Sequence, residues 1–248
     1  MMSDRNTKRI AMWSGPRNIS TAMMRSFENR LDTIVVDEPL YAAFLHETGI
    51  DHPGRDDILK AQSKDWNKVA EELLAPLPDG VDIFYQKHMC HHLLDDMGRD
   101  WINELTNVFL IRDPRAMIAS YIQSRETVCL ADIGVAQQLE LFKRTADRLG
   151  SAPPVLDSVD MLKNPAAMLA KLCACIDIPF DQAMLSWPKG SRDSDGVWAP
   201  YWYDSVVKST GFAPYSEKKI VLSAALEKIA DKAQLVYEEL FKFKINCK

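Results

Sequence analysis

The stretch that decides the expected fold lies near the N-terminus and reads Ile10-Ala11-Met12-Trp13-Ser14-Gly15-Pro16-Arg17-Asn18-Ile19-Ser20-Thr21. An apolar run typical of a strand ends in a turn that contains glycine, proline and arginine, and a helical pattern follows the turn. A second stretch of this kind begins about a hundred residues later and reads Val108-Phe109-Leu110-Ile111-Arg112-Asp113-Pro114-Arg115. Open parallel sheets present backbone N–H groups to anions at such turns. The two stretches therefore predict an anionic ligand that is held at both ends.

Strand and helix patterns alternate along the chain. Short runs rich in valine, isoleucine and phenylalanine predict strands near 8–14, 32–37, 82–87, 106–112 and 153–157. Helices are expected over about 20–30, 39–47, 65–75, 114–125, 134–149, 164–176 and 217–242, the first of them capped by Ser20 or its neighbour. This alternation predicts one α/β domain over residues 1–248, with three layers and a mainly parallel central sheet of about five strands.

The composition is that of a globular protein, with 47% apolar and 26% charged residues. A net charge of −5 provides no global basic field, so neither nucleic acid nor a membrane surface is an expected partner. We expect a cytoplasmic protein, because no apolar run reaches the ~20 residues of a membrane span and the polar N-terminus lacks a signal-peptide pattern. An odd number of cysteines without framework spacing indicates reduced thiols. They are Cys90, Cys129, Cys173, Cys175 and Cys247.

The first turn has the chemistry of a phosphate site. Its N–H groups and the dipole of the following helix converge on one position, where Arg17 adds a positive charge. Ser20 and Thr21 add hydroxyl donors. The ATP-binding pattern G-x-x-x-x-G-K-[ST] is absent, since no Gly-Lys pair precedes Ser20, and a conventional Mg-nucleotide site is not expected.

Three patches resemble sulfotransferases. Pro16-Arg17-Asn18-Ile19-Ser20-Thr21 resembles the loop with which that family grips the 5′-phosphosulfate of its donor, 3′-phosphoadenosine 5′-phosphosulfate. Arg112 at a strand end, followed eight residues later by Ser120, resembles the 3′-phosphate site. The late pair Lys189-Gly190, followed by Gly196-Val197-Trp198, resembles the loop that folds over the nucleotide. The resemblance implies a fold related to P-loop nucleotide kinases (P-loop NTPase-like), the phosphosulfate donor as cosubstrate, and no obligatory metal.

One position departs from the family loop. The family's loop glycine corresponds to Ile19, and a β-branched residue does not readily take the positive φ that glycine permits. Gly15, four residues earlier, is the alternative residue for the turn, and the donor pocket could be reshaped.

Two residues compete for the role of general base. Glu38 follows the second expected strand, where some branches of the family carry a catalytic carboxylate, and the adjacent Asp37 should point to the opposite side. His88 ends the third strand, where cytosolic sulfotransferases carry Lys-x-His, but here Lys87 and His88 are adjacent, so only one of them can keep the family orientation. We favour Glu38 as the base, with Lys87 or Arg17 steadying the leaving group.

Other clusters allow structural and functional interpretations. His88, His91 and His92 with Asp96 have the chemistry of metal ligands but not the usual spacing, and the start of a helix is the preferred interpretation. Aromatic residues crowd 187–203 and predict either an adenine-stacking lid or core packing. The stretch 46–57 lacks periodicity and could border the acceptor site or be an ordinary loop.

The leading hypothesis is transfer of a sulfuryl group to a hydroxyl or amine of a small-molecule acceptor. There are two alternatives. The first is a nucleotide-dependent, kinase-like phosphotransferase, which would need Mg²⁺ ligands from Ser20 or Thr21 with Asp37 or Glu38. The second is a non-catalytic nucleotide-binding protein on the same fold. The sequence identifies neither the acceptor nor the oligomeric state.

Overall fold

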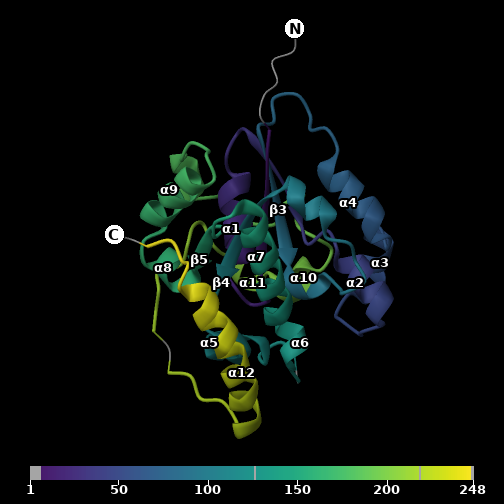
Figure 1. Ribbon diagram of the computed structural model, residues 1–248, viewed down its shortest axis with the longest axis vertical. Coiled ribbons are helices and arrows are strands. Elements are labelled where there is room, and N and C mark those ends of the chain that lie inside the picture. Colours follow the sequence, from purple (N-terminus) through teal and green to yellow (C-terminus); the bar gives the residue numbers. More distant parts are fainter. Residues whose placement is uncertain (1–6, 126, 218, 247–248) are drawn as a thin grey trace.

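The five strands form one parallel sheet in a computed structural model that describes residues 7–125, 127–217 and 219–246 (Figure 1). The strand order is β2-β3-β1-β4-β5, and every neighbouring pair is parallel. The strands are β1 (Lys8–Ser14), β2 (Thr33–Asp37), β3 (Ile83–Met89), β4 (Thr106–Ile111) and β5 (Val155–Asp157). The prediction of an α/β fold with a central parallel sheet is confirmed.

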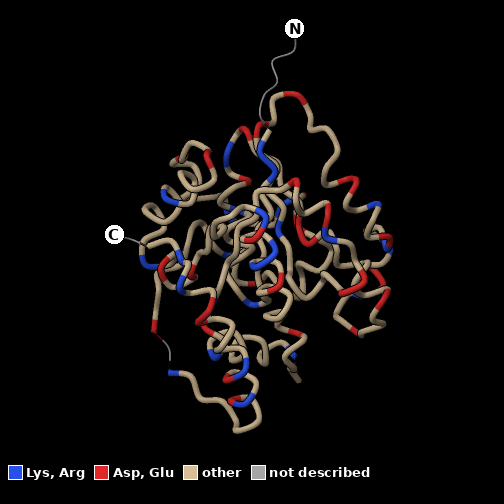
Figure 2. Tube along the Cα trace, in the orientation of Figure 1, with Lys and Arg blue, Asp and Glu red and all other residues tan. Residues whose placement is uncertain are grey.

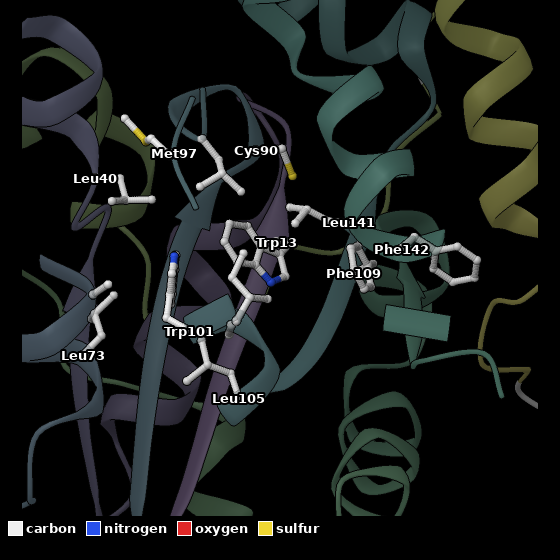
Figure 3. Close-up of a cluster of buried hydrophobic side chains, with 14 of the residues drawn as sticks. Trp13, Leu40, Leu73, Cys90, Met97, Trp101, Leu105, Phe109, Leu141 and Phe142 are labelled. Carbon is white, nitrogen blue, oxygen red and sulfur yellow. The ribbon is translucent and has the colours of Figure 1, made fainter. Parts of the chain in front are cut away.

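Side chains of β1 alternate between two apolar cores, because successive strand residues point to opposite faces. Ala11 and Trp13 belong to one core, Ile10 and Met12 to the other, and all four are fully buried. Figure 3 shows Trp13 near the centre of the first core, with Trp101 on one side and Leu141 on the other. The sheet is therefore covered on both faces, as its apolar strands require.

The helices pack on these two faces. Helices α1, α8 and α9 supply the core that holds Met12, while α4, α7 and α12 supply the core that holds Trp13. The helices are α1 (Ser20–Glu28), α2 (Tyr41–Thr48), α3 (Arg55–Ala61), α4 (Trp66–Leu74), α5 (Pro114–Tyr121), α6 (Leu130–Ile133), α7 (Val135–Leu149), α8 (Ser158–Lys163), α9 (Pro165–Cys175), α10 (Ala199–Trp202), α11 (Asp204–Val207) and α12 (Ala224–Phe241). Short 3₁₀ helices are η1 (Cys90–His92), η2 (Asp100–Glu104) and η3 (Gln182–Leu185).

Several expected boundaries are wrong. Helix α12 begins at Ala224 rather than near 217, because the Ser223 hydroxyl accepts a hydrogen bond from Leu226 N at 3.4 Å and caps it there. Helix α1, by contrast, begins at Ser20 as expected, and the neighbouring Ile19 takes the cap position without a side-chain hydrogen bond. The end of the stretch 46–57 already belongs to α3.

The cysteines within the described part of the chain are free thiols, with Cys90 and Cys173 buried and Cys129 and Cys175 exposed. Cys247 lies outside the described residues. Basic and acidic residues are interspersed along the trace (Figure 2). Within the described ranges, we find no helix with both the length and the apolar character that a membrane crossing requires.

The topology brings distant segments to one edge of the sheet. Strand β1 lies between β3 and β4, and Met12 is in register with both Lys87 and Val108. The carboxyl ends of these three strands therefore meet side by side, which is where open α/β sheets bind ligands.

Candidate active site

The turn after β1 is fixed to β4 by a side-chain amide. Asn18 donates from Nδ2 to Leu110 O at 3.1 Å, and its Oδ1 accepts from Ile19 N at 2.9 Å. Gly15 is required by close packing, since a Cβ there would lie 2.8 Å from the carbonyl oxygen of Ile133. The left-handed residue is Arg17, with φ of 55°, whereas Ile19 has an ordinary φ of −86°. Gly15 therefore does not supply the turn's positive φ, and the isoleucine causes no strain.

Two arginines meet beside this turn. Arg17 donates from Nε to the Ser120 hydroxyl at 3.3 Å, and Arg112 donates from Nη1 to the carbonyl oxygen of Arg17. Burial lowers the pKa of both guanidinium groups, and the charge of Arg17 lowers that of Arg112 further. Among the described residues neither arginine forms an ion pair, although buried charges are normally paired. The two cations are thus suited to an anionic ligand.

Arg115 behaves differently and is structural. It pairs with Glu227 at 3.0 Å and Asp231 at 2.5 Å on α12. Helix α5 itself begins as the sequence predicts, with the Asp113 carboxylate accepting from Ala116 N at 2.9 Å.

Lys87 binds both carboxylates at the end of β2. Its Nζ lies 2.8 Å from Asp37 Oδ1, 2.5 Å from Glu38 Oε1 and 2.7 Å from the Tyr203 hydroxyl. Because Glu38 leaves the strand with φ of 40°, its side chain turns back toward the same lysine as that of Asp37. The expectation that Asp37 points to the opposite side is therefore wrong, although of the two carboxylate residues only Glu38 lines the cavity described below.

Burial and ion pairing have opposite effects on the pKa of Glu38 and on that of Lys87. Burial raises the pKa of Glu38, and the charge of Lys87 opposes that change without reversing it. Burial lowers the pKa of Lys87, but Asp37 and Glu38 outweigh it and the pKa is raised overall. Lys87 therefore stays an ammonium group, and the Glu38 carboxylate is a stronger base than a solvated one.

His88 does not reach this cavity. As the neighbour of Lys87 in β3, it points to the opposite face of the sheet, where it stacks on Trp13 at 4.3 Å and is 1% exposed. Burial lowers its pKa to about 3. The hypothesis that His88 is the base is therefore wrong, because strand alternation gives the cavity to Lys87.

The late loop is also placed differently from the expectation. Lys189 is exposed and, like Gly190 and Trp198, does not line the cavity. Gly190 has φ of 126° and donates from N to Val207 O at 3.0 Å, which gives it a turn role. Trp198 is 1% exposed and donates from Nε1 to the Tyr203 hydroxyl at 3.0 Å. The expectation that these three residues line the donor site is therefore corrected, and the aromatic residues of this segment that do line the cavity are Trp202 and Tyr203.

One cavity of about 310 Å³ unites the remaining predicted residues except Gly15, which does not line it. Its wall includes the turn and the cationic and acidic groups predicted from the sequence, namely Pro16, Arg17, Asn18, Ile19, Ser20, Thr21, Glu38, Lys87, Arg112 and Ser120. Sequence reasoning missed the other wall residues, which include Tyr41, His52, His91, His92, Tyr121, Leu162, Ser209 and Phe212. No motif marks them, but His91 and His92 belong to the cluster considered for a metal site, and His52 lies in the stretch 46–57 that was expected either to border the acceptor site or to be an ordinary loop. The described residues contain no group of three or more side chains that could hold a metal ion.

Comparison with known proteins agrees with this geometry. A family model described as a sulfotransferase domain matches residues 8–229. Two solved structures share the fold: a sulfotransferase domain from the Synechococcus PCC 7002 olefin synthase (TM-score 0.56, 17% identity, 93% of this chain and 96% of that one) and a sulfotransferase from Alicyclobacillus acidocaldarius (TM-score 0.53, 12% identity, 95% and 96%).

Two curated relatives come from Arabidopsis thaliana. Branched-chain-amino-acid aminotransferase-like proteins 1 and 2 are 36% and 34% identical to this chain over 205 and 204 residues. The match covers 82% of this chain but 36% of each relative, so the chain spans about a third of their length. The match of the family model over most of the sequence shows that this chain belongs to the sulfotransferase domain family.

Proposed function

We propose that the chain transfers a sulfuryl group from 3′-phosphoadenosine 5′-phosphosulfate to a hydroxyl or amine of a small acceptor. The observation that carries this proposal is the pair Arg17 and Arg112, two partly buried guanidinium groups without a carboxylate partner among the described residues, in the same cavity as the Glu38–Lys87 pair. A ligand with phosphate groups would supply the missing negative charge.

The residues present fit such a donor. Arg17, Asn18, Ser20 and Thr21, at the N-terminal end of α1, would hold the 5′-phosphosulfate. Arg112 and Ser120 would hold the 3′-phosphate. The apolar wall formed by Ile19, Leu162 and Phe212 is suited to the nucleoside. The donor supplies an activated sulfuryl group, and it requires no metal ligand from the protein.

Within this proposal the chain's own groups have separate tasks. Glu38 takes the proton of the acceptor hydroxyl, for which its raised pKa is favourable. Arg17 stabilises the charge that develops on the leaving phosphate. Lys87 keeps Glu38 in place, because its three N–H groups are already directed to Asp37, Glu38 and Tyr203. Between the two candidates for steadying the leaving group, this favours Arg17.

The alternatives have less support. A magnesium-dependent phosphotransferase would need Asp37 or Glu38 for the metal, and both carboxylates are bound to Lys87. The features that would favour a non-catalytic binding protein are Ile19 at the family's glycine position and the shifted Lys87-His88 pair. Ile19 is unstrained and Lys87 lies at the cavity, so neither feature now argues for lost transfer.

Titration calorimetry tests the proposal. Adenosine 3′,5′-bisphosphate should bind to the wild-type chain without metal and more tightly than Mg·ATP. Transfer of radiolabelled sulfate from the donor to a panel of hydroxyl and amine compounds should follow. Selective binding of Mg·ATP would overturn the sulfotransferase proposal, and bisphosphate binding without transfer to any compound would favour the non-catalytic alternative.

A further inference from the structure

Three histidines that the proposed donor site does not use line the same cavity. His52 follows α2, whereas His91 and His92 form η1 directly after β3. Aromatic rings surround them: the His92 ring is stacked on Tyr41 at 4.3 Å and on Phe44 at 4.9 Å. This packing fixes the orientation of the His92 ring.

The His92 ring directs a free nitrogen toward Glu38. His92 is 2% exposed, and its Nδ1 has no hydrogen-bond partner among the described residues. This Nδ1 lies 3.9 Å from Glu38 Oε2, the carboxylate oxygen that does not contact Lys87. A single oxygen atom can lie at about 2.8 Å from each of two atoms at that separation. One acceptor hydroxyl can therefore bridge His92 Nδ1 and Glu38 Oε2.

The other two imidazoles extend this polar surface. His91 Nδ1 is buried and also lacks a partner within the described part of the chain. The Tyr41 hydroxyl and His52 Nδ1 are hydrogen-bonded at 2.8 Å, which leaves Nε2 of His52 for a ligand. Buried polar atoms without partners are costly, so a ligand that satisfies them gains affinity.

Among the residues that line this part of the cavity, none carries a charge that is free for a ligand, and Asp51, Arg125 and Asp132 act on His52 and His91 from outside the lining. Burial lowers the pKa of His52 to about 4, that of His91 to about 3 and that of His92 well below its usual value, so all three are neutral near pH 7. The nearby carboxylate, Glu38, is already paired with Lys87. A charged group brought here would be desolvated without a counter-charge.

We propose that His52, His91 and His92 form the acceptor subsite, that it takes an uncharged hydroxyl compound with at least one further hydrogen-bonding group, and that His92 Nδ1 holds the reacting hydroxyl beside Glu38. The proposal rests on the proposed function and narrows its acceptor class. In the step, the hydroxyl proton passes to Glu38 Oε2 and the acceptor oxygen forms a bond to sulfur. The bond between sulfur and the bridging phosphate oxygen breaks, and its electrons leave with adenosine 3′,5′-bisphosphate. His92 stays neutral throughout.

A matched series of phenols tests the charge of the acceptor. Tyrosol, tyramine and 4-hydroxyphenylacetate share one ring and one phenol, but their second group is neutral, cationic and anionic. In calorimetry on the bisphosphate-saturated chain, and in transfer assays, tyrosol should bind more tightly and react with a kcat/KM at least about tenfold higher than either charged analogue. Equal or better performance of a charged analogue, or no binding of tyrosol, would overturn the proposal.

Variants of His92 test its contact with the hydroxyl. His92→Phe keeps a ring between Tyr41 and Phe44 but removes Nδ1, and should lower kcat/KM for tyrosol by about 10²-fold with an unchanged Kd for the bisphosphate. His92→Asn brings an amide near the Nδ1 position and should recover part of the loss. The exposed His46 provides the control, because His46→Phe should change neither value. An unaffected His92→Phe would contradict the proposal, whereas a wild-type chain that fails to bind the bisphosphate would contradict the proposed function itself.

Discussion

Arg17 and Arg112 are adjacent, yet their substitution should have different kinetic consequences. Arg17→Ala removes the charge that we propose for the leaving phosphate and should lower kcat by about 10²–10³-fold. Arg112→Ala should mainly weaken binding of the donor. The Kd for adenosine 3′,5′-bisphosphate should rise by about ten- to a hundredfold, since a hydrogen bond to a charged group contributes about 1.5–3 kcal/mol. Calorimetry and steady-state kinetics on both variants measure this split.

The control for these two variants is Arg115→Ala. Arg115 pairs with Glu227 and Asp231 on α12 and does not line the cavity, so both constants should stay near wild type. Equal bisphosphate affinity in wild type and Arg112→Ala would contradict the 3′-phosphate assignment.

Glu38 should give the enzyme an acidic limb in its pH profile. A carboxylic acid cannot take a proton, so turnover should fall as the pH drops through the pKa of Glu38. Because burial raises that pKa, the fall should occur above the range of a solvated glutamate, which is about 4.3. Glu38→Gln should lower kcat by about 10²–10⁴-fold and remove the limb, while bisphosphate binding persists. A limb that survives in Glu38→Gln would assign the proton transfer to another group.

At the scale of the element, the turn before α1 forms with Ile19 at the position of the family's glycine. Ile19 has φ of −86° and packs against the core beneath α1. Ile19→Gly should therefore lower the free energy of unfolding by about 1 kcal/mol or more, through lost apolar contact and greater freedom of the unfolded chain. Urea unfolding and bisphosphate titration measure the outcome. A gain in bisphosphate affinity would show that the turn needs glycine after all.

Elements could be predicted where a local pattern determines them. The Arg112 to Ser120 spacing placed both residues beside Arg17, because a strand and the helix that follows it fix their relative positions. Lys87 and His88 could not be separated by pattern alone, since one register step decides which of them faces the cavity. His91 and His92 lie in the short helix η1, and the wall residues between 205 and 213 lie in the short helix α11 and the segment after it; the positions of these pieces depend on tertiary packing. Short-range periodicity carries no information about them.

At the scale of the molecule, the strand order explains why one cavity collects residues so distant in sequence. Placing β1 between β3 and β4 puts the turn at Arg17 next to Lys87 on one side and Arg112 on the other. Glu38 joins them because β2 pairs with β3, and Glu38 N donates to Lys87 O at 2.9 Å. The proposed donor and acceptor groups thus depend on the same sheet edge.

The buried histidines should make the whole fold sensitive to acid. Burial lowers the pKa of His52 to about 4 and those of His88 and His91 to about 3, whereas each histidine in the unfolded chain titrates near 6.5. Between these values the unfolded state binds more protons, so this contribution to stability is complete above pH 6.5 and is lost as the pH falls. Each histidine can contribute a slope of up to about 1.4 kcal/mol per pH unit, opposed in part by Glu38, whose pKa is raised.

Urea unfolding at several values between pH 7.5 and pH 4.5 measures this slope. The free energy of unfolding should decline steadily below pH 6.5. His88→Gln should reduce the slope of this decline by close to the contribution of one proton, which is about 1.4 kcal/mol per pH unit. His46→Gln removes an exposed histidine from α2 and should leave the slope unchanged. A free energy of unfolding that is constant over this range would mean that the folded and unfolded chains bind the same number of protons, and it would contradict the lowered pKa values of the buried imidazoles.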